Sequence, residues 1–99
     1  MTDPALNRRP LEGIKVLDLG QIYNGPYAGL LLAQAGADVI KIEPLRGDAL
    51  RGRGRATGTI PWSVAALNQN KRGLALDLKS GQGKALLFDL ARQADILLE

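Results

Sequence analysis

Short apolar runs alternate along this chain with longer segments in which apolar residues recur at helical spacing. The predicted strands are 14–19, 37–43, 73–78 and 95–98, and the predicted helices are 27–35, 61–69 and 81–93. The first strand is apolar on nearly both faces, as in sheets that helices cover on both sides. Strands that alternate with helices predict an α/β fold of parallel βαβ layers with right-handed crossovers.

Turn and capping residues support these boundaries. Pro26 suits the first position of a helix, and Gly36 suits the left-handed residue just past its end. Because the helix at 27–35 is apolar almost all round, we expect it to be well buried. Ser80 is the expected N-cap of the helix at 81–93, whose apolar positions fall on one face.

Residues 1–10 form a polar leader, and residues 11–99 form the folded part. The last predicted strand has no loop after it, so we interpret the chain as the amino-terminal part of a larger domain. The leader lacks the apolar core of a signal peptide, and no apolar run approaches the length of a membrane span. We therefore expect a cytoplasmic protein without a membrane partner.

The composition narrows the possible chemistry. The chain contains no Cys and no His, which excludes disulfides, thiol nucleophiles and zinc sites built on those residues. It also removes the commonest general base. A net charge of +3 is too small to indicate a nucleic-acid partner by itself.

Several polar segments lie where predicted strands end, the edge at which open parallel sheets bind ligands. Residues 20–25 have the glycine spacing of a phosphate-binding loop but lack its lysine and hydroxyl residue. A nucleotide hydrolase is therefore disfavoured. Two interpretations stay open: a tight strand-to-helix turn, or a loop whose backbone amides approach a phosphate or an adenine.

The loop at 45–59 is rich in glycine and contains Arg46, Arg51, Arg53 and Arg55. It has no aromatic platform for bases, so a solvated loop or a clamp for a small phosphorylated ligand is favoured over nucleic acid. Glu43 is either an exposed strand-end carboxylate paired with an arginine or a ribose-binding acid. The missing glycine fingerprint argues against the second role.

Three further polar segments are interpreted from their places relative to the predicted strands. Asp18 lies inside the first strand, so its carboxylate must be hydrogen-bonded, and an orienting role is favoured over catalysis. Residues 70–72 precede the third strand, and we interpret them as a turn with solvated charges. Asp77, Lys79 and Ser80 lie at the carboxyl end of that strand and are expected at the ligand edge.

In their order along the chain, these segments resemble the beginning of class III CoA-transferases, the family that includes formyl-CoA transferase and carnitine CoA-transferase. The matching segments are 11–19, Gly25-Pro26, 32–44, Gly47-Asp48, Arg51, 68–72, 76–79 and 94–99. No single motif is decisive, but the ordered set is specific. The resemblance covers nearly the whole chain after residue 10.

The resemblance implies a partial Rossmann-like CoA-binding domain at 11–99. It implies an enzyme that moves CoA from an acyl-CoA to a small carboxylic acid, as an interlocked homodimer, with CoA as a substrate and without a tightly bound cofactor. A catalytic aspartate that forms an aspartyl-CoA thioester lies beyond residue 99, so no catalytic residue and no metal ligand is assigned here.

By position, the resemblance implies CoA contacts at Ile22, Tyr23, Asn24, Leu76, Asp77, Leu78 and Lys79. Pro44 stands where some members have a CoA-contacting arginine, and Arg46 is the expected substitute. Three alternatives remain open: an acyl-CoA racemase of the same family, a non-catalytic CoA- or nucleotide-binding module, and a truncated product without a stable fold.

Overall fold

The computed structural model describes residues 8–52 and 58–99. The strands are β1 (Lys15–Asp18), β2 (Asp38–Glu43), β3 (Arg72–Ala75) and β4 (Ile96–Leu98). The helices are α1 (Asn24–Gln34), the 3₁₀ turn η2 (Ala49–Arg51), α3 (Trp62–Leu67) and α4 (Gly81–Gln93). Arg53, Arg55 and most of the predicted leader lie outside the described residues.

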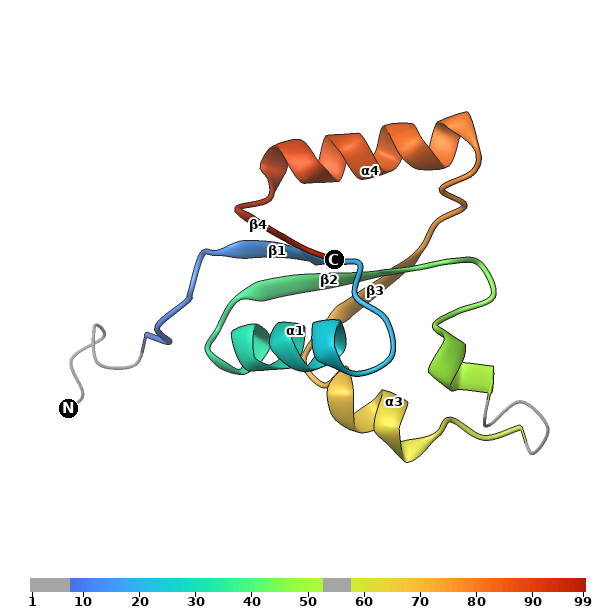
Figure 1. Cartoon of the computed structure of the whole chain (residues 1–99). Helices are drawn as coiled ribbons and strands as arrows, with labels where there is room; N and C mark the ends of the chain where they lie inside the picture. Colours follow the sequence, from blue (N-terminus) through green and yellow to red (C-terminus); the bar gives the residue numbers. More distant parts are fainter. Residues whose placement is uncertain (1–7, 53–57) are drawn as a thin grey trace.

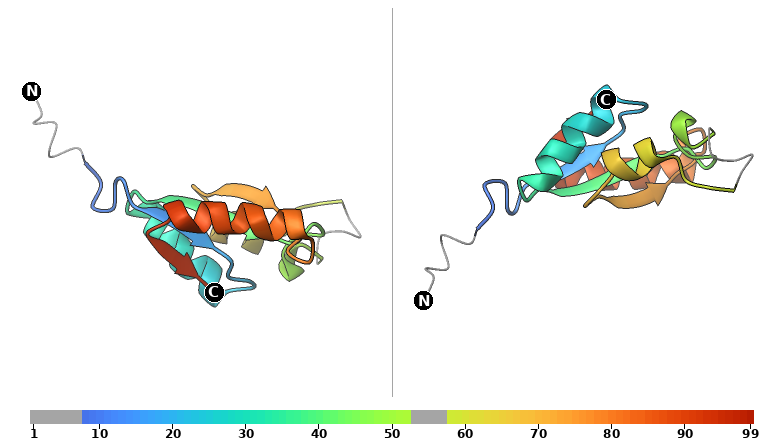
Figure 2. Two further views of the ribbon diagram at one scale, coloured as in Figure 1. Left: turned by 90° about the horizontal axis from the view of Figure 1, so that it is seen from above. Right: turned by 90° about the horizontal axis from the view of Figure 1, so that it is seen from below.

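The four strands form one parallel sheet in the order β3-β2-β1-β4. Helices α1 and α3 lie on one face of this sheet and α4 lies on the other (Figure 1). In the rotated views, α4 covers the sheet when it is seen from above, and α1 and α3 cover it when it is seen from below (Figure 2). The predicted parallel α/β fold is confirmed.

The core lies between α1 and the two central strands. Val16 and Val39 pack against Ala33 of α1 and against Ala37, and all four residues are at most 5% exposed. Gly29 lets α1 approach the sheet closely, because a Cβ there would lie 2.5 Å from Oδ2 of Asp18. These contacts bury the central strands against α1.

Helix α1 differs from its prediction at its start and in its burial. It begins at Asn24, so Pro26 occupies its third position, where the missing N–H still costs nothing because first-turn N–H groups have no helical partner. Tyr27 and Leu31 are 53% and 50% exposed. The expectation of burial all round was wrong, since only one side of α1 faces the sheet.

The outer elements are more exposed. Helix α4 has the predicted bounds, and Oγ of its N-cap Ser80 accepts a hydrogen bond from the Gly83 N–H at 3.0 Å. Leu86 and Phe88 of this helix are nevertheless more than half exposed. Strand β3 is exposed along its length and ends at Ala75, three residues before the predicted end. Beyond it, the Leu76 N–H still donates to the Glu43 carbonyl at 2.9 Å.

Candidate functional site

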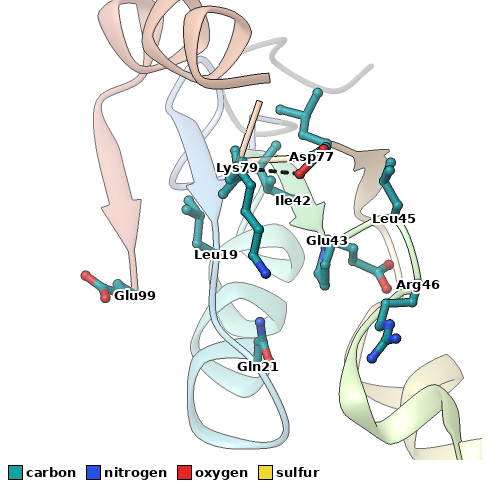
Figure 3. Close-up of a pocket in the computed structure, with 12 residues that line it drawn as sticks. Leu19, Gln21, Ile42, Glu43, Leu45, Arg46, Asp77, Lys79 and Glu99 are labelled. Atoms are coloured by element: carbon teal, nitrogen blue, oxygen red, sulfur yellow. Dashed lines mark hydrogen bonds between the residues drawn. The ribbon is translucent and has the colours of Figure 1, made fainter. Parts of the chain in front are cut away.

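A pocket of about 630 Å³ opens at the carboxyl ends of the strands, the edge that the sequence predicted (Figure 3). Its lining residues are Leu19, Gln21, Ile42, Glu43, Pro44, Leu45, Arg46, Leu76, Asp77, Leu78, Lys79 and Glu99. They come from the carboxyl end of β2, from the loops after β1, β2 and β3, and from the residue after β4. The pocket is therefore assembled from segments that are far apart in the sequence.

Two cationic side chains, from different loops, line this pocket. Lys79 extends across the edge toward Gln21, and Arg46 lies on the side of Glu43 (Figure 3). The carboxylate of Asp77 accepts a hydrogen bond from the Lys79 backbone N–H at 3.0 Å, which fixes the start of the loop before α4. An ammonium and a guanidinium at one pocket provide charge-assisted donors for an anionic group.

The structure brings together five of the eight residues that the sequence assigned to ligand binding. Arg46 and the stretch 76–79 line the pocket, whereas Ile22, Tyr23 and Asn24 do not. These three lie further along the loop from Gln21 and are exposed. The sequence did not predict Leu19, Gln21, Ile42, Leu45 or Glu99, although Gln21 directly precedes the predicted loop residues.

The loop after β1 is unusually tight. A Cβ at Gly20 would lie 2.5 Å from Cα of Gly25, and a Cβ at Gly25 would lie equally close to Cα of Gly20. The glycine spacing that resembles a phosphate-binding loop is thus accounted for by the close approach of two backbone segments. Between them Ile22 has φ of +69°, which for a β-branched residue costs about 1–3 kcal/mol.

Asp18 and Lys71 form a buried ion pair behind this loop. Their Nζ–Oδ2 distance is 2.8 Å, and the side chains are 1% and 0% exposed for Lys71 and Asp18. Asp18 also accepts from the Gly20 N–H, and Lys71 donates to the Pro26 carbonyl, both at 2.8 Å. The prediction that Asp18 is hydrogen-bonded is confirmed.

The interpretation of Lys71 as a solvated charge was wrong. Strand β3 is staggered, so that Arg72 pairs with Ile40 in the middle of β2, and the residue before it lies well inside the layer. From there the long side chain reaches Asp18 beneath α1. Burial lowers the pKa of Lys71, although its hydrogen bond with Asp18 opposes the shift.

A second buried network links β2 to the loop that follows it. Nζ of Lys41 lies 3.4 Å from Oδ2 of Asp48, and both side chains are 3% exposed. Glu43 accepts two hydrogen bonds from the Arg51 guanidinium, at 2.7 and 2.8 Å, and one from the Asp48 N–H at 2.7 Å. The hydrogen bond from Arg51 holds the pKa of Glu43 below its ordinary value of 4.5, against the opposing effect of burial.

These contacts decide between the two interpretations of Glu43. Its partner is an arginine, as one of them proposed, but the residue is only 9% exposed. Arg51 donates a hydrogen bond to each carboxylate oxygen of Glu43. In a dinucleotide-binding fold this carboxylate would instead accept hydrogen bonds from a ribose. Glu43 therefore organises the loop at 44–51.

Within 8–52 and 58–99, no group of three or more carboxylate, imidazole or thiol side chains is placed to hold a metal ion. No helix in the same ranges is long and apolar enough to cross a membrane.

Comparison with known proteins shows the family to which the chain belongs. The family model for CoA-transferase family III matches residues 11–99, and the chain belongs to that family. A solved CaiB/BaiF family protein from Brucella suis superposes with a TM-score of 0.84 at 35% identity, covering 91% of this chain and 25% of that one.

Curated relatives are similar over the same region. A succinyl-CoA–L-malate CoA-transferase alpha subunit from Chloroflexus aurantiacus is 42% identical over 93 residues. A formyl-CoA:oxalate CoA-transferase from Escherichia coli O6:H1 is 46% identical over 92 residues. Each alignment covers 91% of this chain and 22% of the relative, so the chain spans about a fifth of their length.

Proposed function

We propose that this chain binds the CoA moiety of an acyl-CoA at the carboxyl edge of its sheet, as the amino-terminal portion of a CoA-transferase. The observation that carries the proposal is the pocket of about 630 Å³, with Lys79 and Arg46 projecting at it from separate loops. CoA carries several phosphates, and cationic donors at a strand edge are suited to hold them. Membership of CoA-transferase family III supports this choice of ligand.

The proposed reaction moves CoA from an acyl-CoA to a small carboxylic acid. In the mechanism implied by the family resemblance, an aspartate outside residues 1–99 attacks the thioester, and a mixed anhydride and an aspartyl-CoA thioester follow. We assign CoA binding, and no catalytic step, to the residues described. CoA enters as a substrate and not as a tightly bound cofactor.

Lys79→Ala tests the proposed phosphate contact. Loss of one charge-assisted hydrogen bond should weaken CoA binding by about 1–2 kcal/mol, or about 5- to 30-fold in Kd. Isothermal titration calorimetry of the chain with CoA measures the change. Lys84→Ala is the matched control, because Lys84 is an exposed lysine of α4 that does not line the pocket. Equal affinities for the Lys79 variant and the original chain would remove Lys79 from the site.

An acyl-CoA racemase is the alternative enzyme, since the resemblance places its proton-carrying His and Asp beyond residue 99 as well. Assays of the protein that includes the downstream sequence separate the three functions. Transfer of CoA to a carboxylate supports the proposal, exchange of the α-proton of an acyl-CoA supports the racemase, and CoA binding with neither activity supports a binding module.

The remaining expectations about partners stay predictions. They are an interlocked homodimer of the longer protein, a cytoplasmic location and the absence of a nucleic-acid partner. For the last, CoA should protect the loop at 45–59 from trypsin, while random-sequence oligonucleotides bind weakly. Tight oligonucleotide binding with a steep salt dependence would contradict it.

A further inference from the structure

We infer that Lys41 and Asp48 are positioning residues, which together hold the loop after β1 in the backbone conformation that the ligand edge requires. The inference rests on the proposed function, because the ligand whose binding is affected is CoA. Neither side chain lines the pocket, so both would act through the backbone of the loop.

The pair forms hydrogen bonds with the backbone of the loop at two different residues. Nζ of Lys41 donates to the Gly20 carbonyl at 3.1 Å, and Oδ2 of Asp48 accepts from the Ile22 N–H at 3.3 Å. The two charged atoms lie 3.4 Å apart, so each bond to the loop is coupled to the other through the ion pair. Gln21, which lines the pocket, lies between the two anchored residues.

The position of Asp48 is itself well determined. Its Oδ1 accepts from the Leu50 N–H at 2.9 Å, and its own N–H donates to Glu43 at 2.7 Å. Glu43 in turn is held by Arg51. Asp48 therefore connects the loop after β1 to the end of β2 and to η2.

Stability alone is a poor explanation for this arrangement. A buried ion pair costs desolvation that its attraction rarely exceeds, and well-packed apolar residues often replace such pairs without loss. Lys41 and Asp48 are each about 3% exposed, so this cost applies to both. What an apolar pair could not supply is the two bonds to the loop backbone, one of which holds Ile22 at φ of +69°.

The test is the double variant Lys41→Met plus Asp48→Asn, which removes both charges and so leaves no unpaired buried charge. Its matched control is Arg72→Met plus Asp38→Asn, which removes an exposed pair from β3 and β2. A second control, Val39→Ala, destabilises the core without touching the loop. If the double variant does not fold, Lys41→Leu plus Asp48→Asn replaces it, because this pair of changes likewise leaves no unpaired buried charge.

Two readouts are compared in these proteins. The first is the strong intraresidue HN–Hα NOE of Ile22, the NMR signature of a positive φ, together with hydrogen-exchange protection of its amide. The second is the CoA dissociation constant from calorimetry. We expect the double variant to lose the Ile22 signature and to bind CoA about tenfold more weakly, while both controls keep the signature and the affinity.

Three results would decide against the inference or separate it from the proposed function. Retention of the Ile22 signature in the folded double variant overturns the positioning role, whether or not CoA affinity changes. Equal loss of affinity in the Val39 control also overturns it, because the effect would then follow stability. If the original chain does not bind CoA, the proposed function fails, and the Ile22 signature alone decides whether the pair holds the loop.

Discussion

Two neighbouring residues, Lys71 and Arg72, form ion pairs of opposite character. Lys71 pairs with Asp18 at 2.8 Å with both side chains at most 1% exposed. Arg72 pairs with Asp38 at 2.7 Å, with side chains that are 67% and 46% exposed. The comparison shows that the distance between the charged nitrogen and oxygen atoms does not distinguish a buried structural ion pair from a surface one. Burial, set here by the stagger of β3 under α1, makes the difference.

The largest effect expected from this comparison is that of Lys71→Met. Removal of the ammonium leaves the Asp18 carboxylate buried without its charge partner, which should lower the free energy of unfolding by about 3–5 kcal/mol. Arg72→Met is the adjacent control, and loss of its exposed pair should cost at most about 1 kcal/mol.

Urea denaturation followed by circular dichroism measures both values. Similar losses for the two variants would mean that burial does not separate the pairs in solution. A third variant, Lys71→Met plus Asp18→Asn, should recover part of the loss, because it removes the unpaired charge as well.

The same contrast between inner and outer positions exists for apolar side chains. Leu17 of β1 and Leu97 of β4 are direct partners in the sheet register, but they are 2% and 51% exposed. Leu17→Ala should lower the free energy of unfolding by about 3 kcal/mol through lost burial and a cavity. Leu97→Ala should change it by about 0.5 kcal/mol or less, and equal effects in denaturation would contradict the layered core described above.

The smallest expected effect concerns Glu43 and acid. Its pKa is lowered in the folded state by the hydrogen bond from Arg51. The carboxylate therefore contributes stability above its ordinary pKa of 4.5, and this contribution is lost as the pH falls through the lower folded-state value. Glu43→Gln should cost about 1–2 kcal/mol at pH 7 and less at acid pH.

Denaturation curves across the acid range test this dependence. The original chain and the Glu43→Gln variant should converge in stability as the pH falls below 4.5. A constant difference in the free energy of unfolding between the two proteins across that range would show that folding does not lower the pKa of Glu43.

The sequence by itself determined the order of the elements and much of their extent. Helix α4 has the predicted bounds and the predicted Ser80 cap, because capping and helical periodicity are local properties. The strand-then-turn pattern placed the candidate site at the carboxyl edge, where Arg46 and the stretch 76–79 now line one pocket. The ordered motifs also identified the family, which the match over residues 11–99 confirms.

Only the tertiary structure decided which charges are buried and which loop residues reach the pocket. Lys71 meets Asp18 across 53 positions of sequence, and Asp48 meets Ile22 across 26. Such pairings depend on strand register and on the packing of α1, neither of which a local pattern contains. For the same reason Ile22, Tyr23 and Asn24 lie beside the pocket and not in its wall. Caps, turns and strands depend on residues that are close together in the sequence. Burial depends on elements that meet only after the chain has folded.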